Sequence, residues 1–220
     1  MNFASELFPD YWLSITHILY AIMLGIALWR APWHHLKRPK DANIFFASCL
    51  ILWLVWKISG GITPALEFHL LMITTVTLMF GWQFAIISAS IAQLGLSIGG
   101  DAHWATYSLN VLINGVIPVW VTFFVFQLVY IWLPRHFFIY VYGIAFFGGA
   151  LAMLFSRLAG LGLLLMSGSY NFMTLGDEPL FVILLLFPEA FVNGLLITAL
   201  IVYHPEWVSS FSDKHYLKGK

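Results

Sequence analysis

The amino-acid sequence predicts an all-α protein that crosses a membrane with about seven helices. Of its 220 residues, 61% are hydrophobic and only 9% are charged, whereas a soluble domain carries roughly a quarter charged residues. So few charges cannot cover a surface in water, and most of the surface must therefore face lipid. Long apolar stretches recur along the whole chain, and basic residues gather in alternate loops. We therefore expect a single transmembrane domain over residues 1–220.

The first half of the chain contains four apolar stretches, and a helix that crosses a bilayer needs roughly 20 apolar residues. Residues 12–29 and 43–58 approach this length and are separated by a basic loop. Residues 66–80 and 84–98 are shorter, and only Gly81-Trp82-Gln83 separates them. Such a short connection containing glycine favours a turn, so we expect these two helices to form a tight hairpin.

The second half contains three longer apolar stretches, at residues 109–133, 137–157 and 180–203. Each has the length of a membrane-crossing helix. A further apolar stretch, residues 158–166, is too short to cross alone. It either extends the preceding helix or lies at the membrane interface.

Basic residues in the loops predict the orientation of the chain, because they favour the cytoplasmic side. Seven spans place the loop after the first helix, the loop after the fifth and the C-terminus on one side. That side carries Arg30, Lys37, Arg38, Lys40, Arg135, Lys214, Lys218 and Lys220. The charges on the other side are acidic: Glu6, Asp10, Asp101, Asp177 and Glu178. We expect the N-terminus outside and the C-terminus inside a bacterial cytoplasmic (inner) membrane.

Composition and motifs argue against several classes of function. A formal net charge of zero gives no reason to expect a nucleic-acid partner. The single cysteine, Cys49, offers neither an intrachain disulfide nor a thiolate cluster. The sequence has no phosphate-binding loop ending in Gly-Lys-Ser/Thr, so we do not expect it to hydrolyse ATP. Because Glu6 and Asp10 precede the first apolar run without a basic region, we expect no cleaved signal, and retention of Met1 stays open.

Six ionisable side chains fall within or beside the predicted spans, and such groups mark function by default because they are costly in a bilayer. They are His17, Lys57, Glu67, His69, Arg157 and Glu189. Lys57 and Arg157 lie near predicted outer ends, where long cationic side chains can reach the headgroups. We therefore expect these two at the interface.

Imidazole and carboxylate groups that suit a first-row transition metal gather on the predicted outer side. Glu67 and His69 open the third span, His17 lies in the first span, and His103 lies in the next outer loop. Residues two apart do not share a helical face, so Glu67 and His69 can both be ligands only if Glu67 precedes the helix. A lone histidine within a span is more often a hydrogen-bonded core residue than a ligand, and this interpretation applies to His17.

Amide and carboxyl side chains on the fifth and seventh spans predict a buried polar network. Asn110 and Asn114 are four residues apart, and so are Glu189 and Asn193, so each pair shares a helical face. Such groups can satisfy one another across a bundle. The network then either holds the helices together or contacts a ligand.

Two small residues on the first span, Ala21 and Gly25, are also four apart. Small residues at this spacing let helix backbones approach closely. The pair could accommodate an internal helix or a helix of another subunit.

Four segments, taken in order along nearly the whole chain, resemble the CbiM/NikM type of substrate-specific component of energy-coupling factor importers of cobalt and nickel. They are residues 1–12 (MNFASELFPDYW); 68–82, with Phe68-His69-Leu70-Leu71 and Phe80-Gly81-Trp82; 93–116, with Gln93, Gly99-Gly100-Asp101, Asn110 and Asn114-Gly115-Val116; and 188–207, with Pro188-Glu189-Ala190, Asn193-Gly194-Leu195 and His204-Pro205-Glu206-Trp207. The resemblance implies seven helices around a site near the outer face, with the N-terminal segment tucked inward.

The resemblance also implies a ligand set. In the family the ion is bound by the terminal amine, by the backbone nitrogen and imidazole of a histidine at position 2, and by a histidine of the third helix. Met1 and His69 match two of these positions, but position 2 is Asn2. One imidazole is therefore missing, and Glu67, His17 and His103 are the candidates to replace it. A site with two histidines and a carboxylate would suit tetrahedral zinc or cobalt better than square-planar nickel.

The function that follows is capture of a divalent transition metal ion for import, with partner coupling and ATPase subunits supplying the energy. We expect the stripe of Ala21 and Gly25 and the basic loops to contact those partners. No tightly bound cofactor is expected, because cobalt, nickel or zinc would be the substrate.

Two alternatives stay open. Asn2 favours a non-transporting scaffold or assembly factor, and Glu67, His69 and Glu189 could serve an intramembrane metal-dependent enzyme, although no His-Glu-x-x-His motif occurs.

Overall fold

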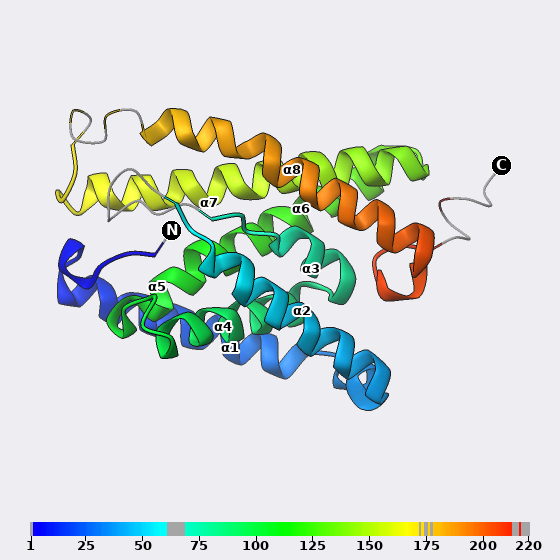
Figure 1. Cartoon of the computed structure of the whole chain (residues 1–220), viewed down its shortest axis with the longest axis horizontal. Helices are drawn as coiled ribbons and strands as arrows, with labels where there is room; N and C mark the ends of the chain where they lie inside the picture. The colour runs from blue at the N-terminus through cyan, green and yellow to red at the C-terminus, as the bar shows by residue number, and fades with distance from the viewer. Residues whose placement is uncertain are drawn as a thin grey trace.

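The computed structural model describes residues 2–60, 69–171, 173, 176, 178–212 and 216, with the side chains of Glu178 and Pro179 left out. The chain forms an elongated bundle whose helices run back and forth along its long axis (Figure 1). When Trp104–Trp132 is counted as one continuous helix, the described part contains seven helices, which confirms the predicted all-α membrane fold. Four are long and apolar enough to cross a membrane: Asp10–Arg30, Trp104–Trp132, Ile139–Met166 and Leu180–Tyr203.

The first two helices, α1 (Asp10–Arg30) and α2 (Pro39–Lys57), are joined by a 3₁₀ turn at Trp33–Lys37. Pro39 opens α2 at a position where its missing N–H costs nothing. Helix α1 lies at the edge of the bundle, and its buried residues are Leu13, Tyr20 and Ala27. Most of its apolar surface is therefore available to lipid or to another protein.

Helices α3 (Ile73–Phe80) and α4 (Trp82–Ile98) form the predicted hairpin, with Gly81 as the single linking residue. Gly81 has a φ of 85°, which is readily adopted only by glycine. The prediction of one helix over residues 66–80 is wrong for residues 69–72, which are not helical, and residues 61–68 lie outside the described part. Helix α3 is consequently only 8 residues long.

The later helices are longer. Helix α5 (Tyr107–Val111) runs through a π-helical turn, Leu112–Val116, into α6 (Ile117–Trp132). A second π-helical segment, Ile139–Phe146, leads into α7 (Phe147–Met166), so the apolar stretch 158–166 extends this helix. Helix α8 (Glu178–Tyr203) completes the bundle.

The alternation of the helices separates the charged loops. Arg30, Lys37 and Arg135 lie at the end of the bundle that also holds residues 204–212, which we call the C-terminal end (Figure 1). The opposite end, where residues 2–8 lie, is called the N-terminal end. There Lys57 Nζ lies 3.2 Å from Asp101 Oδ2, at a half-exposed helix end as expected. That the C-terminal end faces the cytoplasm is a prediction from its basic loops.

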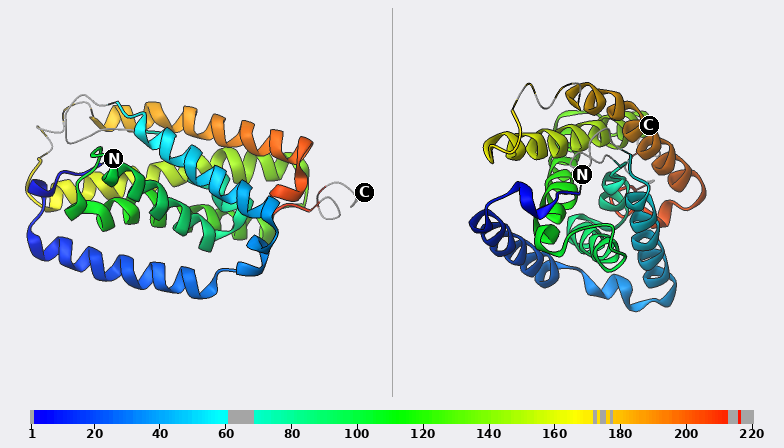
Figure 2. Two further views of the ribbon diagram at one scale, coloured as in Figure 1. Left: turned by 60° about the horizontal axis from the view of Figure 1, so that its bottom comes forward. Right: turned by 60° about the vertical axis from the view of Figure 1, so that its left-hand side comes forward.

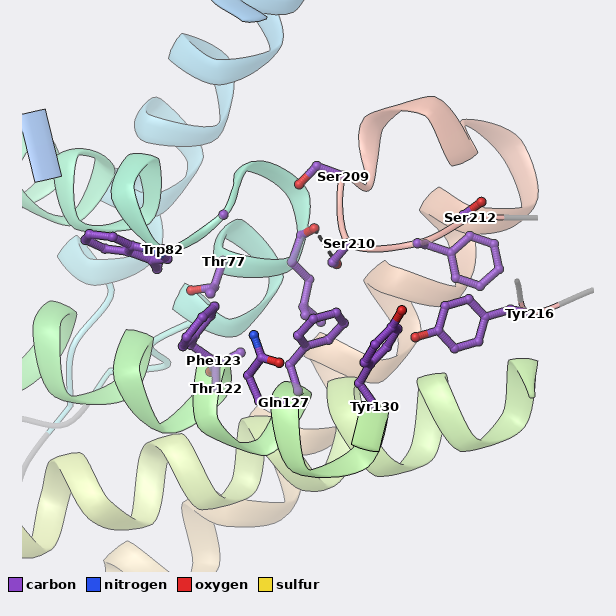
Figure 3. A pocket seen from close by; sticks show the side chains of 14 residues that line it. Thr77, Trp82, Thr122, Phe123, Gln127, Tyr130, Ser209, Ser210, Ser212 and Tyr216 are labelled. Atoms are coloured by element: carbon purple, nitrogen blue, oxygen red, sulfur yellow. Dashed lines mark hydrogen bonds between the residues drawn. The ribbon is translucent and has the colours of Figure 1, made fainter. Parts of the chain in front are cut away.

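Residues 208–212 fold back against α3 at the C-terminal end. The amides of Ser209 and Ser210 donate to the carbonyls of Met79 (3.0 Å) and Leu78 (3.2 Å), which satisfies carbonyls at the end of the helix. A cavity of about 510 Å³ opens beside them (Figure 3). The polar side chains among its described lining residues are those of Thr77, Trp82, Thr122, Gln127, Tyr130, Ser209, Ser210, Ser212 and Tyr216.

Candidate metal-capture site

His69 lies in the non-helical segment of residues 69–72 that precedes α3, and it is 2% exposed. Its ring lies against Trp56 of α2, with 5.3 Å between the ring centroids. The Trp56 indole nitrogen donates to the Leu71 carbonyl at 2.9 Å, so α2 holds both the ring and the backbone of the segment. His69 Nδ1 lies 3.1 Å from the Leu70 carbonyl. When Nδ1 donates there, the other ring nitrogen carries the lone pair that a metal ion needs.

Arg157 of α7 contacts the same segment, and it corrects a prediction. We expected this side chain to reach the membrane interface, but it is 0% exposed inside the bundle. Its Nη2 donates to the His69 carbonyl at 2.9 Å, and its Nη1 donates to Asn114 Oδ1 at 3.1 Å. Asn114 sits in the π-helical turn between α5 and α6. A buried guanidinium of this kind is tolerated only when its donors find acceptors.

Glu189 of α8 holds the segment through its amides. Its two carboxylate oxygens accept hydrogen bonds from Leu71 N at 2.7 Å and Met72 N at 2.8 Å. Asn193, one turn further along α8, donates to Glu189 Oε1 at 2.8 Å and accepts from the Thr75 amide at 2.9 Å. These bonds replace the helical ones and explain why α3 begins only at residue 73.

Met72 has a left-handed backbone, with a φ of 52°. A residue other than glycine in this region stores of the order of 1–3 kcal/mol of strain. The bond from its amide to the Glu189 carboxylate helps to hold that conformation. The segment that bears His69 is therefore rigidly defined by α2, α7 and α8.

The N-terminal segment is fixed by α5 and the turn before it. The Phe3 amide donates to Asn110 Oδ1 at 3.1 Å, and Thr106 Oγ1 donates to the Phe3 carbonyl at 2.6 Å. The Phe3 side chain is 0% exposed and packs edge-on against Phe8. The dark blue N-terminal segment thus turns back into the ring of helices (Figure 2, right). Asn110 anchors this segment and is not part of the hydrogen bonds around Glu189.

The other predicted ligands are dispersed. His17 is exposed on α1, with Nδ1 2.8 Å from Ser108 Oγ, and His103 is exposed in the loop before α5. Met1 and Glu67 lie outside the described residues. Within the described part no group of three His, Cys, Asp or Glu side chains is arranged to hold a metal ion. Of the predicted ligands that the structure describes, His69 alone lies in the buried centre.

The small residues of α1 face outward. Ala21 and Gly25 are both exposed, and a Cβ added at Gly25 would meet nothing within 4 Å. Among the described residues no internal helix is therefore seated on this stripe.

Sequence reasoning missed the roles of Arg157, Trp56 and Thr106. Arg157 was placed at the interface because the apolar stretch beyond it was counted separately. Nothing in the local sequence identifies the Leu71 carbonyl that Trp56 binds. For Arg157, the available signal was that a cation within an apolar run is costly in a membrane and is therefore expected to have a buried partner.

These features define a class: a multi-pass membrane protein whose helices surround a buried polar centre near one end. The sequence profile of the CbiM family, described as the cobalt uptake substrate-specific transmembrane region, matches residues 2–207. The chain belongs to this family, whose members are the substrate-binding membrane components of energy-coupling factor transporters of cobalt and nickel.

A solved structure, described as a crystal structure of a truncated transition metal transporter, resembles this one with a TM-score of 0.70. It is 16% identical in sequence, and the match covers 93% of this chain and 100% of that one. At this identity the likeness establishes the fold alone. A comparison with curated proteins gave no match.

Proposed function

We propose that this chain captures a divalent transition metal ion at the N-terminal end of the bundle and that His69 binds it. The observation that carries the proposal is the construction around His69: an imidazole buried in a membrane protein, on a segment whose backbone is bonded by Arg157 and Glu189. Neutral imidazole nitrogen is a favoured ligand of cobalt, nickel and zinc. Partners that orient a ligand in this way strengthen metal binding.

The partners follow from what the chain lacks. It carries no phosphate-binding loop, so ATPase subunits and a membrane coupling subunit must supply the energy for import. The exposed face of α1 around Ala21 and Gly25 is the proposed contact for the coupling subunit. The proposed location is the bacterial cytoplasmic membrane, with the N-terminal end outside.

One observation favours a second function, a scaffold or assembly factor without transport. Asn2 stands where the family has a histidine ligand. The enzyme alternative is weaker, because both oxygens of Glu189 already accept backbone hydrogen bonds and are not disposed to act as a base.

Cellular metal accumulation tests the proposal. Cells that express the chain with its coupling and ATPase subunits are given cobalt, nickel or zinc, and intracellular metal is measured by mass spectrometry. His69→Ala should abolish the accumulation, whereas His103→Ala, at an exposed loop position, should leave it unchanged. Accumulation by the wild type that does not exceed that of cells lacking the chain would instead support the scaffold, and equal accumulation above that level by wild type and His69→Ala would show transport without His69.

A further inference from the structure

Helix α4 carries buried polar side chains that no residue in the described part satisfies. Gln93 is 0% exposed, and both its amide oxygen and its amide nitrogen lack a hydrogen-bond partner. Ser97 is 3% exposed, and its hydroxyl also lacks one. By contrast, Ser90 donates to the Ile86 carbonyl at 2.8 Å. An amide buried without hydrogen bonds costs about 1–3 kcal/mol, so a ligand that supplies the missing bonds would be stabilised here.

The unsatisfied groups share one face of α4. Gln93 and Ser97 are four residues apart and thus neighbours on the helix surface. Leu94 and Ile98 are exposed, which places the lipid-facing side elsewhere on the helix. Trp53 of α2 packs against Gly95, about half a turn away from Gln93. The face of Gln93 and Ser97 therefore points to the interior of the bundle.

The depth of Gln93 matches that of the N-terminal segment. A Cβ added at Gly115 would lie 2.6 Å from Ala89 Cβ, so these two residues are level where α4 meets the antiparallel chain that follows α5. Four residues nearer the N-terminal end of the bundle in each chain, Gln93 lies close to the level of Val111. Asn110, the neighbour of Val111, holds the Phe3 amide.

Asn2 adds a third unsatisfied group at this depth. Its Oδ1 is buried and has no hydrogen-bond partner in the described part. Because Asn110 pins the adjacent Phe3, Asn2 enters the bundle at the level of Gln93. Three buried side chains with unpaired oxygen atoms thus converge to within about one helical turn in depth, toward the N-terminal end of the bundle.

From this convergence, and resting on the proposed function, we infer that Gln93 and Ser97 line the metal site and that, with Asn2, they make it rich in oxygen ligands. Carbonyl, hydroxyl and water oxygens favour six-coordinate ions over square-planar nitrogen-bound ones. The captured ion is then bound by His69 and by the side-chain oxygens of Asn2 and Gln93. Ser97 holds a water molecule that the ion retains.

Co²⁺ titration of the purified full-length protein tests this inference, with Gln93→Leu and Ser97→Ala as variants. Gln93→Leu should weaken Co²⁺ binding about tenfold or more, and it should raise the melting temperature of the metal-free protein because an unpaired amide is removed. Ser97→Ala should weaken binding by a smaller factor. Ser90→Ala is the matched control, since its hydroxyl lies on the same face but is already bonded, and its affinity should stay within about twofold of wild type.

The visible spectrum of the Co²⁺-bound protein supplies an independent readout. Six-coordinate Co²⁺ gives weak bands, and intense bands of four-coordinate Co²⁺ would overturn the inferred geometry. Wild-type affinity in both Gln93→Leu and Ser97→Ala would overturn the inferred ligands. The proposed function would survive either result if His69→Ala abolishes binding, whereas it fails, and this inference with it, if the wild type binds no divalent ion.

Discussion

Arg157 and Glu189 bind the same short stretch of backbone with opposite charges. Arg157 donates to the carbonyl of His69 at 2.9 Å, and Glu189 accepts from the amide of Leu71 at 2.7 Å, two residues further along. Both side chains are essentially inaccessible to solvent. Together the two side chains fix the backbone position of His69. Because removal of either one leaves the other charge uncompensated in the bundle, the stability of the fold also depends on this pair.

Arg157→Met should destabilise the protein by about 3–5 kcal/mol, since it leaves the Glu189 carboxylate without the nearby cation. The melting temperature in detergent, followed by tryptophan fluorescence, measures this loss. Arg157→Met combined with Glu189→Gln should be less destabilising than the sum of the two single changes, because the two side chains act on one segment. Additive effects would show that they act independently.

Glu189→Gln should weaken metal binding about tenfold while His69 remains in place. The glutamine amide nitrogen cannot accept from the Met72 amide, so the segment loses one of its two bonds to α8, and the loss of such outer partners costs roughly 10–100-fold in affinity. Glu206→Gln, at an exposed position, is the control. Equal affinities for the two variants would separate Glu189 from the site.

Most of the fold follows from local properties of the sequence, and the site does not. The apolar runs and the glycine between α3 and α4 predict the helices and their hairpin. Arg157 was misplaced because the predicted span ended there; the helix continues to Met166, nine residues or roughly 13 Å further. Joining the stretch 158–166 to that span would have placed the guanidinium inside the membrane.

The sequence of the segment 69–72 does not itself predict that these residues lie outside the helix. Its conformation depends on hydrogen bonds from Glu189 and Arg157, which lie more than 80 residues away along the chain. Glu189 and Asn193 could be paired from their spacing, because contacts within one helix follow its period. The spacing does not predict that they bind the backbone amides of Leu71, Met72 and Thr75, because these amides belong to a distant part of the chain.

Asn110→Ala should release the N-terminal segment, because it removes the acceptor of the Phe3 amide. Hydrogen exchange of the N-terminal peptide, followed by mass spectrometry, should become faster by about tenfold or more, which corresponds to a loss of roughly 1.4 kcal/mol. Metal affinity should fall in parallel if this segment supplies ligands. Unchanged exchange would show that Thr106 and the packing of Phe3 suffice to hold it.

Asn2→His should shift the preference of the protein from Co²⁺ towards Ni²⁺. The change replaces an amide oxygen with an imidazole nitrogen, and nitrogen-rich sets suit square-planar Ni²⁺. The ratio of the two dissociation constants, measured by isothermal titration on wild type and variant, is the readout. A ratio that does not change would place residue 2 outside the ligand set.

Gly25→Leu should impair assembly with the coupling subunit but leave metal binding by the isolated chain unchanged. The glycine lies on the exposed face of α1 with open space before it, so a bulky side chain would hold a partner helix away. Copurification with coexpressed coupling subunit measures the effect. Gly162→Leu, at a glycine of α7 with equally open surroundings, is the matched control, and equal copurification of both variants would contradict the proposed docking face.

Metal binding to the purified chain is the most direct test of the proposal that His69 binds the captured ion. Wild-type protein and His69→Ala are titrated with Co²⁺, and bound metal is quantified per chain. We expect one ion per wild-type chain and at least a hundredfold loss of affinity in His69→Ala, which corresponds to roughly 2.7 kcal/mol. Equal binding by the two proteins, with His69→Ala folded to the same melting temperature, would contradict it.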